Sequence, residues 1–258
     1  MRVGCGIGGE MDRIAVVTGA AGGLGRAISA SLMAQGMLVV GVDIDPALDA
    51  MAATTGSGER FVPRHVDLFD VGAIGALFEG LAAEFGGVDA LVNNAGTCYM
   101  GEFPEISAQE LDRQMALNFS AAFHCCQRAV PLMLGRAKLD GGVKKIVNIS
   151  SNGAYNFDVF DPPHYRASKA ALDTLTKDLA RRYAKERIAV NSVAPAMTET
   201  PLFGVLSAEV LERAISAMPH GRAMQPSEVA AWVAFLISGA GDVCSGNVII
   251  LNQGRDVR

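Results

Sequence analysis

The chain has 258 residues, of which 50% are hydrophobic and 19% charged, and its formal net charge is −5 at pH 7. This composition excludes an intrinsically disordered chain, and a chain of this length buries roughly 75% of its surface without help from disulfides or a metal. Nucleic-acid-binding proteins usually carry a net positive charge, so the acidic balance disfavours that class.

Three absences in the sequence bear on location and metal binding. The five cysteines form no C-x-x-C pair, and no segment resembles a signal peptide or an apolar membrane span. The four histidines are scattered, with none paired at i, i+4, so we expect no metal site. We therefore expect a cytoplasmic protein that binds neither nucleic acid nor membrane.

Short β-branched runs alternate with longer amphipathic segments along the chain. The expected strands cover residues 14–18, 38–43, 61–67, 90–93, 145–150, 188–193 and 248–251. The expected helices cover residues 24–35, 46–54, 71–85, 108–134, 165–185 and 227–237. Because several strands are nearly continuous apolar runs, the sequence predicts an α/β fold with a Rossmann-like, doubly wound parallel sheet of about seven strands and helices on both faces.

No linker, repeat or block of charge divides the chain beyond its first residues. We therefore expect a disordered extension over residues 1–12 and one catalytic domain over residues 13–258. In a doubly wound sheet, ligands bind at the carboxyl ends of the strands. The two longest irregular segments, residues 152–164 and 196–206, are expected at that edge.

A glycine-rich segment follows the first expected strand and precedes a helix. It reads Thr18-Gly19-Ala20-Ala21-Gly22-Gly23-Leu24-Gly25. Glycines allow the backbone to approach a pyrophosphate, and the amino end of the next helix offers free N–H groups to it. The G-x-x-x-G-x-G spacing differs from the usual dinucleotide fingerprint, and no G-K-[ST] follows, which disfavours a P-loop nucleotidase. By itself the segment is equally consistent with a tight turn that binds nothing.

Asp43 ends the second expected strand, 18 residues after Gly25. A carboxylate at this place can accept hydrogen bonds from both ribose hydroxyls of NAD, and its charge repels a 2′-phosphate. No basic residue adjoins it in Gly-Val-Asp-Ile-Asp. A helix cap is the alternative role, which Asp45 fills better, so the sequence predicts NAD rather than NADP.

Tyr165 and Lys169 lie at i, i+4 near the start of a long expected helix, on one face and about 6 Å apart along the axis. A free tyrosine has a pKa near ~10. A neighbouring ammonium and the positive nicotinamide of NAD⁺ favour the phenolate, which makes Tyr165 a candidate general acid or base near neutral pH. Such a pair on its own is common on protein surfaces.

Taken together in chain order, these motifs resemble the short-chain dehydrogenase/reductase family. The resemblance rests on the glycine-rich loop, Asn93-Asn94-Ala95-Gly96, the serines that end the fifth expected strand, the Tyr165/Lys169 pair and Pro195. It covers the chain from Arg13 to about Gly254. The sequence is similar to the single-domain branch that includes 3-oxoacyl-carrier-protein reductases and alcohol and hydroxysteroid dehydrogenases.

The resemblance implies a role for each matching residue. For catalysis it implies Tyr165 as acid/base, Ser151 on the substrate oxygen, Lys169 on the nicotinamide ribose, and Asn118 as a residue that distorts its helix and holds a water. For cofactor binding it implies Gly19, Gly23, Leu24, Gly25, Asp43, Asp67, Leu68, Asn94, Ala95, Gly96, Tyr165, Lys169, Pro195, Thr198 and Thr200.

Three features depart from the family pattern. Ser151 precedes Tyr165 by 14 residues, one more than the commonest spacing, and we keep Ser151 because Ser150 would be 15 away. Ala196 follows Pro195 where the family usually has glycine, which requires a negative φ there. The ending Leu-Asn-Gln-Gly replaces the common V-D-G-G near a subunit interface.

The sequence thus predicts an NAD-dependent oxidoreductase that interconverts a secondary alcohol and a ketone. Its partner is a small-molecule alcohol or carbonyl compound, medium-sized and partly apolar, and we expect a homo-oligomer, tetramer or dimer, assembled through residues 108–134 and 165–185. A catalytically silent NAD(H)-binding sensor or scaffold is the alternative, which the complete set of catalytic matches disfavours. An epimerase of the same fold usually needs a longer chain.

Overall fold

The computed structural model describes residues 12–54, 60–156, 161–205 and 207–256. Seven strands form one sheet in the order β3-β2-β1-β4-β5-β6-β7, and every neighbouring pair is parallel. The strands are β1 Ile14–Thr18, β2 Leu38–Asp43, β3 Phe61–His65, β4 Ala90–Asn93, β5 Lys144–Ile149, β6 Ile188–Pro195 and β7 Val248–Leu251. The predicted doubly wound parallel sheet is confirmed, and its order reverses between β1 and β4, where such sheets bind ligands.

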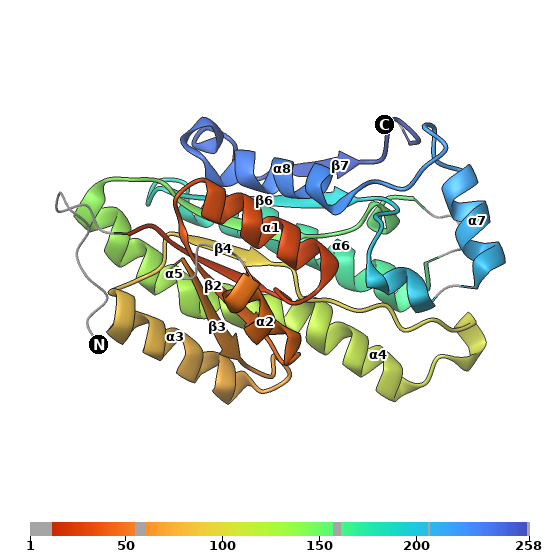
Figure 1. Ribbon diagram of the computed structural model, residues 1–258, viewed down its shortest axis with the longest axis horizontal. Helices are drawn as coiled ribbons and strands as arrows, with labels where there is room; N and C mark the ends of the chain where they lie inside the picture. The colour runs from red at the N-terminus through yellow and green to blue at the C-terminus, as the bar shows by residue number, and fades with distance from the viewer. Residues whose placement is uncertain (1–11, 55–59, 157–160, 206, 257–258) are drawn as a thin grey trace.

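Helices cover both faces of the sheet (Figure 1). On one face α1 Gly23–Ala34 packs beside α8 Pro226–Ile237, and α2 Ala47–Thr54 joins the same apolar core. On the other face α3 Val71–Phe85 and α5 Ala121–Asp140 pack together next to α6 Pro163–Tyr183. The inner strands β1, β2, β4, β5 and β6 are buried on both sides, which explains why the sequence shows continuous apolar runs there.

Two expected helical features differ from the structure. The single helix expected over residues 108–134 is α4 Ala108–Met115, a π-helical segment Ala116–Ser120, and α5. The distortion surrounds Asn118, as the family resemblance implies. Helix α7 Ala208–Ser216 was not predicted, although Ser207 caps it through a hydrogen bond from the Val210 amide.

The edges of three strands also differ from the prediction, and β5 covers Lys144–Ile149 rather than residues 145–150. β3 ends at His65 rather than at residue 67, because the main-chain oxygen of Asp67 accepts from the Asp70 amide in a turn that precedes α3. β6 continues to Pro195, where its pairing with β7 still holds. These shifts matter because they set where the site-bearing loops begin.

The amino end of the sheet is held by a buried cluster of charges. Asp89 accepts hydrogen bonds from the Ile14 amide at 2.8 Å and from Lys144 Nζ at 2.7 Å, and Arg136 Nη2 lies 3.6 Å from the same carboxylate. All three charged side chains are less than a tenth exposed. The cluster joins β1, β4, β5 and α5 at the edge of the sheet away from the ligand-binding edge.

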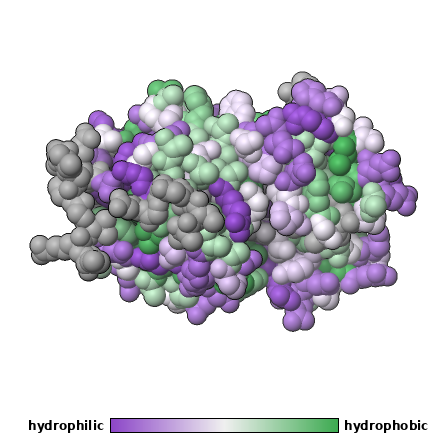
Figure 2. Space-filling view, in the orientation of Figure 1, coloured by the Kyte–Doolittle hydropathy of each residue, from purple (hydrophilic) through white to green (hydrophobic). Residues whose placement is uncertain are grey.

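Hydropathy varies over short distances on the surface of the described residues. On the face shown in Figure 2, hydrophilic and hydrophobic residues are interspersed over the described part of the chain. Within the described ranges, no helix is both long and apolar enough to cross a membrane. Over the same ranges, no three metal-ligating side chains gather in one place, and all four cysteines are free thiols. The extension expected over residues 1–12 lies outside the described residues except for Asp12.

Candidate active site

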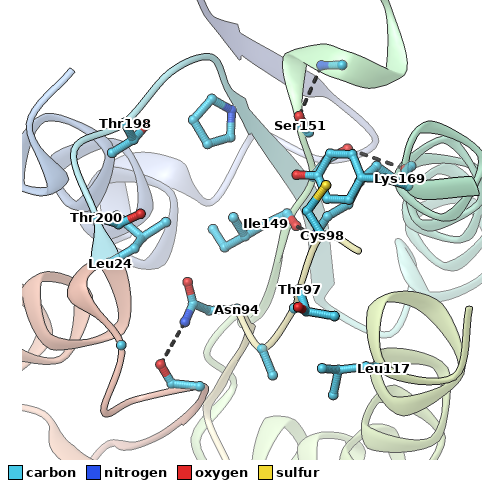
Figure 3. Close-up of a pocket in the computed structure, with 18 of the residues that line it drawn as sticks. Leu24, Asn94, Thr97, Cys98, Leu117, Ile149, Ser151, Lys169, Thr198 and Thr200 are labelled. Carbon is cyan, nitrogen blue, oxygen red and sulfur yellow. Dashed lines mark hydrogen bonds between the residues drawn. The ribbon is translucent and has the colours of Figure 1, made fainter. Parts of the chain in front are cut away.

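A cavity of about 510 Å³ opens at the carboxyl ends of the strands. Its walls come from the loops after β1, β2, β3, β4, β5 and β6, together with α7. Figure 3 shows Leu24, Thr198 and Thr200 along one side, Cys98, Ser151 and Lys169 at the opposite side, and Asn94 between them. The two ends of the cavity therefore differ in chemical character.

The glycine-rich loop forms the first end. Gly19 has φ of +63°, a conformation that side chains rarely adopt. A Cβ atom on Gly25 would lie 2.1 Å from the Gly19 carbonyl oxygen, so the first turn of α1 can pack on the loop only with glycine at this position. Gly22, Gly23 and Leu24 line the cavity at the amino end of α1, where unpaired N–H groups favour an anion.

Asp43 lines the cavity beside this loop and is fixed by three main-chain N–H groups. Its Oδ2 accepts from the Ala21 amide at 2.9 Å, and its Oδ1 accepts from the amides of Ile44 and Asp45 at 2.8 and 3.1 Å. A carboxylate can accept about four hydrogen bonds, so acceptor capacity remains for a ligand hydroxyl. Asp43 also holds the loop itself, a function that the sequence did not reveal.

The segment after β4 crosses the middle of the cavity. Asn94 Nδ2 donates to the main-chain oxygens of Thr18 and Gly19 at 2.9 and 3.0 Å. Thr18 Oγ1 accepts from the amides of Asn94 and Ala95, both at 3.0 Å. These bonds fasten the ends of β1 and β4 to each other, and Thr18 is a site residue that sequence reasoning missed.

The remaining predicted cofactor residues also reach the cavity. Asp67 and the buried Leu68 line it after β3, and Asp67 Oδ1 accepts from the Phe69 amide at 2.9 Å. Pro195, Thr198 and Thr200 line it after β6. Ala196 has no positive φ, so the methyl group in place of the family's glycine is accommodated, and its amide donates to the Leu251 oxygen at 2.8 Å.

Ser151, Tyr165 and Lys169 converge at the other end of the cavity. A hydrogen bond joins the side chains of Ser151 and Tyr165, and Lys169 Nζ lies 5.9 Å from the centre of the Tyr165 ring. Ser151 comes from the end of β5, whereas Tyr165 and Lys169 are separated by one turn of α6. The i, i+4 spacing therefore places both residues in the cavity, as the sequence predicts.

The structure distinguishes the two adjacent serines. Ser151 Oγ accepts from the Gly153 amide at 3.0 Å and faces Tyr165. Ser150 Oγ points the other way and donates to the buried carboxylate of Asp173 at 2.8 Å. Ser151 is consequently the serine placed beside the tyrosine, despite the unusual spacing of 14 residues.

Lys169 is almost fully buried, at 5% exposure, and its Nζ donates to the Ile149 main-chain oxygen at 2.9 Å. Burial lowers its pKa to about 8, although Asp173 and Cys98 oppose this change. Lys169 is therefore still mostly an ammonium at neutral pH. Its pKa lies closer to neutral pH than the pKa of an exposed lysine does.

Without a cofactor, the groups that surround Tyr165 disfavour its phenolate form. Burial raises the pKa of Tyr165 above its ordinary value, and the carboxylate of Asp161 raises it further, while the hydrogen bond with Ser151 lowers it. Lys169 Nζ lies 5.9 Å from the ring centre and is not among the groups that lower this pKa. A phenolate here requires additional positive charge in the cavity.

Asn118 lies in the π-helical segment and is 1% exposed. Its Oδ1 accepts from the Thr97 amide at 2.9 Å, and its Nδ2 donates to the Thr97 oxygen at 2.9 Å and to Ser168 Oγ at 3.1 Å. A Cβ atom added to Gly96 would lie 3.2 Å from Asn118 Oδ1 and 3.3 Å from Lys169 Nζ. Asn118 is thus near Lys169 and is fastened to the loop after β4.

Several residues of this end carry no motif that sequence reasoning could detect. Cys98 and Asp161 line the cavity, and burial, with Asp161 as a second cause, raises the pKa of the Cys98 thiol to about 12. Met197, Phe203 and Val210 give one wall an apolar character, and Arg255 reaches the cavity from the carboxyl end of the chain. Their positions depend on loop packing, which the sequence pattern does not encode.

The tail that carries Arg255 is fastened to the loop after Ser151. Asp256 Oδ2 accepts from Asn152 Nδ2 at 3.2 Å and from Asn156 Nδ2 at 2.9 Å. Gln253, with φ of +59°, binds the His220 amide and the Arg222 oxygen. The tail that follows the altered Leu-Asn-Gln-Gly ending therefore reaches one side of the cavity through Arg255.

Comparison with known proteins identifies the family. A family model described as "Enoyl-(Acyl carrier protein) reductase" matches residues 19–256. A solved structure from Brucella melitensis, described as a short-chain dehydrogenase/reductase of the glucose/ribitol type, is 32% identical with a TM-score of 0.87, and the match covers 96% of this chain and 99% of that one. The chain belongs to the short-chain dehydrogenase/reductase family.

Two further relatives bear on the chemistry. The 2-dehydro-3-deoxy-D-gluconate 5-dehydrogenase of Escherichia coli is 34% identical over 248 residues, which is 94% of each chain. The RhlG/NADP active-site complex of Pseudomonas aeruginosa is 29% identical, with a TM-score of 0.88 and coverage of 95% and 96%. The family is one of oxidoreductases with a nicotinamide cofactor, and it includes members that bind NADP.

The residues of the cavity fit a dinucleotide. Gly19, Gly23 and Gly25 have no side chains, so the backbone there can lie close to a pyrophosphate. The free amino end of α1 favours the negative charge of that group. Asp43 offers acceptors for ribose hydroxyls at the end of β2. The tyrosine, serine and lysine lie at the far end of the same cavity.

Proposed function

We propose that this protein is an NAD-dependent oxidoreductase that interconverts a secondary alcohol and a ketone. The observation that carries the proposal is the single cavity that joins Asp43 and the glycine-rich loop to Ser151, Tyr165 and Lys169. Such an arrangement lets a dinucleotide bound at one end meet a substrate hydroxyl at the other.

In this proposal the nicotinamide, when bound, supplies the hydride acceptor or donor. Ser151 binds the substrate oxygen, and the Tyr165 oxygen takes the hydroxyl proton during oxidation or returns it during reduction. Lys169 adds positive charge beside Tyr165, whose pKa is raised by burial, and the nicotinamide of NAD⁺ would supply the rest when bound. Asn118 and Lys169 lie near each other next to Gly96, where they support transfer of that proton toward solvent.

NAD is proposed rather than NADP because Asp43 brings negative charge to the ribose end of the cavity. The basic residues that line the cavity, Arg166, Lys169 and Arg255, belong to its substrate end. Arg26 lies near the loop, but its Nε donates to the Ala21 oxygen at 2.7 Å and it does not line the cavity. These contacts support NAD even though RhlG is a relative that binds NADP.

The substrate end supports a medium-sized, partly apolar compound that also carries a polar group. Phe203, Val210 and Met197 offer apolar contact on one wall, whereas Asp161 and Arg255 offer charge on another. We place the enzyme in the cytoplasm and propose that it works as a homo-oligomer.

A substrate panel tests the proposal directly. The purified chain is incubated either with secondary alcohols and NAD⁺ or with ketones and NADH, and NADH absorbance is followed. The alcohols include 2-dehydro-3-deoxy-D-gluconate. We expect turnover with at least one compound and little with NADP(H) at the same concentration. Absence of turnover across the panel, with NADH shown to bind, would instead favour a cofactor-binding protein without this activity.

A further inference from the structure

Asp173 is a buried carboxylate two turns of α6 after Tyr165 and one turn after Lys169. The spacing i, i+4, i+8 places all three on one face of the helix. Asp173 is 3% exposed and does not line the cavity, so it touches neither substrate nor cofactor. A buried carboxylate at this depth is costly unless other groups require it.

Hydroxyl groups from the segment after β5 and from β6 hydrogen-bond this carboxylate. Asp173 Oδ2 accepts from Ser150 Oγ at 2.8 Å and from the Tyr155 hydroxyl at 2.9 Å, and Ser192 of β6 also hydrogen-bonds the side chain. Hydrogen bonds of this kind stabilise the charged form of a carboxylate. These hydrogen bonds therefore oppose the effect of burial, which raises the pKa of Asp173.

The second carboxylate oxygen, Asp173 Oδ1, is buried and accepts no hydrogen bond from any residue in the described ranges. Asp173 and Lys169 form no direct ion pair, yet the two charges interact, and the interaction opposes the lowering of the Lys169 pKa by burial. A negative charge held close to a buried ammonium, without a hydrogen bond between them, acts electrostatically.

Few other groups act on Lys169. In the described part of the chain, the titratable groups that face it are Asp173 on α6, Cys98 in the loop after β4, and Tyr165, whose ring centre lies 5.9 Å away. Burial keeps the Cys98 thiol and the Tyr165 hydroxyl neutral near pH 7, because it raises both pKa values. Asp173 is the member of this set whose hydrogen bonds favour a negative charge.

Ser150 links the same carboxylate to the strand end that carries the substrate-binding serine. Its Oγ is shared between Asp173 Oδ2 and the Lys169 main-chain oxygen, which is 3.3 Å away. Ser151 follows directly, and Tyr155 lies in the loop beyond it. One buried group thus contacts both sides of the catalytic arrangement.

We propose that Asp173 is a positioning residue whose buried charge keeps Lys169 in the ammonium form and whose hydrogen bonds hold the end of β5 next to Ser151. It acts through Lys169 and Ser150 rather than on the reacting atoms. The catalytic part of this inference rests on the proposed function. The charge state of Lys169 can be measured without any catalytic turnover.

The decisive experiment is competitive acetylation with acetic anhydride from pH 5.5 to 10, without cofactor, read by peptide mass spectrometry. The exposed Lys177, on the same helix, serves as the internal reference. Asp173→Asn preserves the shape and removes the charge, whereas Asp173→Glu preserves the charge and changes the shape. For the wild type we expect a Lys169 midpoint near pH 8.

In Asp173→Asn the midpoint of Lys169 acetylation falls by about one pH unit or more, because the negative charge of residue 173 has been removed. In Asp173→Glu it stays closer to the wild-type value. Tyr155→Phe, which removes one hydrogen bond and keeps the carboxylate, leaves the midpoint unchanged. An unchanged midpoint in Asp173→Asn, or an equal fall in the Asn and Glu variants, overturns the proposal. If Asp173→Asn does not fold, the wild-type protein decides the question. A wild-type midpoint of Lys169 acetylation below pH 7 contradicts the proposal.

A second readout is the pH profile of ketone reduction, where Lys169 must be protonated. The alkaline limb of kcat moves to lower pH in Asp173→Asn, and the rate approaches that of the wild type in acid. A uniform loss at all pH values indicates a purely structural role and contradicts the proposal. If the wild type itself turns over no substrate, the proposed function fails, whereas the acetylation result still decides the role of Asp173.

Discussion

Lys169 Nζ donates a hydrogen bond of 2.9 Å to the main-chain oxygen of Ile149, the last residue of β5. Ser151 follows Ile149 by two residues, so this bond ties α6 to the strand that delivers the serine. Tyr165 lies one turn earlier on the same helix. The relative positions of the three side chains are therefore fixed by contacts within the protein, as expected for a preorganised site.

The cofactor preference depends on the charge of Asp43. Asp43→Asn keeps an acceptor for the Ala21 amide but removes the negative charge, so we expect the preference for NAD over NADP to narrow by about tenfold, or ~1.4 kcal/mol. Kinetic efficiency with both cofactors measures it. Asp45→Asn removes the same charge two residues away, on an exposed side chain, and leaves the preference intact. Equal efficiency with NAD and NADP in the wild type would refute the assignment.

Cofactor affinity depends on the close packing of Gly25. Gly25→Ala places a methyl group 2.1 Å from the Gly19 oxygen, so the loop must move and NADH binding weakens by at least about tenfold. NADH fluorescence titration measures the dissociation constant. Gly135→Ala in α5 is the matched control, because a Cβ atom there meets nothing within 4 Å. Equal affinity in the two variants would show that the loop does not hold the cofactor.

The stability of the sheet depends on the buried charge of Asp89. Asp89→Ala leaves Lys144 and Arg136 without their buried partner, and we expect the free energy of unfolding to fall by about 3–5 kcal/mol. Urea denaturation at pH 7 measures the change. Asp178→Ala breaks an exposed pair with Arg182 and costs less than ~1 kcal/mol. Similar losses in both variants would contradict the importance of burial.

We propose assembly through α5 and α6, and exposed aromatic residues on α5 agree with it. Phe123 is 40% exposed and contacts Phe119 with ring centres 6.2 Å apart. We expect light scattering to give a dimer or tetramer of the 27.0 kDa chain and Phe123→Asp to shift the mass downward. Val243→Asp, at an almost fully exposed position between α8 and β7, leaves it unchanged. A monomeric wild type at micromolar concentration would refute assembly.

Strand positions were predictable because both faces of the sheet are covered. The run from Ile14 to Val17 is apolar throughout, and the structure gives the strand that contains it, Ile14–Thr18, the predicted bounds. The π-helical segment at Asn118 has no such signal, since it contains neither glycine nor proline. It is maintained by hydrogen bonds to Thr97, a residue from a distant loop, and only the family resemblance pointed to it.

The predicted site residues other than Asn118 line one cavity, but their surroundings were not predictable. Spacing showed that Tyr165 and Lys169 share a helix face, yet it could not show that burial raises the pKa of the tyrosine. Asp173 lies at the same helical spacing and was not singled out, because an isolated Asp in a helix gives no signal of burial. Arg255 reaches the cavity through the folding of the chain's end.

The acid/base role of Tyr165 is tested most directly by turnover of Tyr165→Phe measured beside its affinity for NADH. The substitution removes only the hydroxyl group, so we predict a loss of about 10²–10⁴-fold in kcat with the NADH dissociation constant nearly unchanged. Tyr183→Phe, near the other end of α6, keeps wild-type activity. Wild-type turnover in Tyr165→Phe would contradict the account.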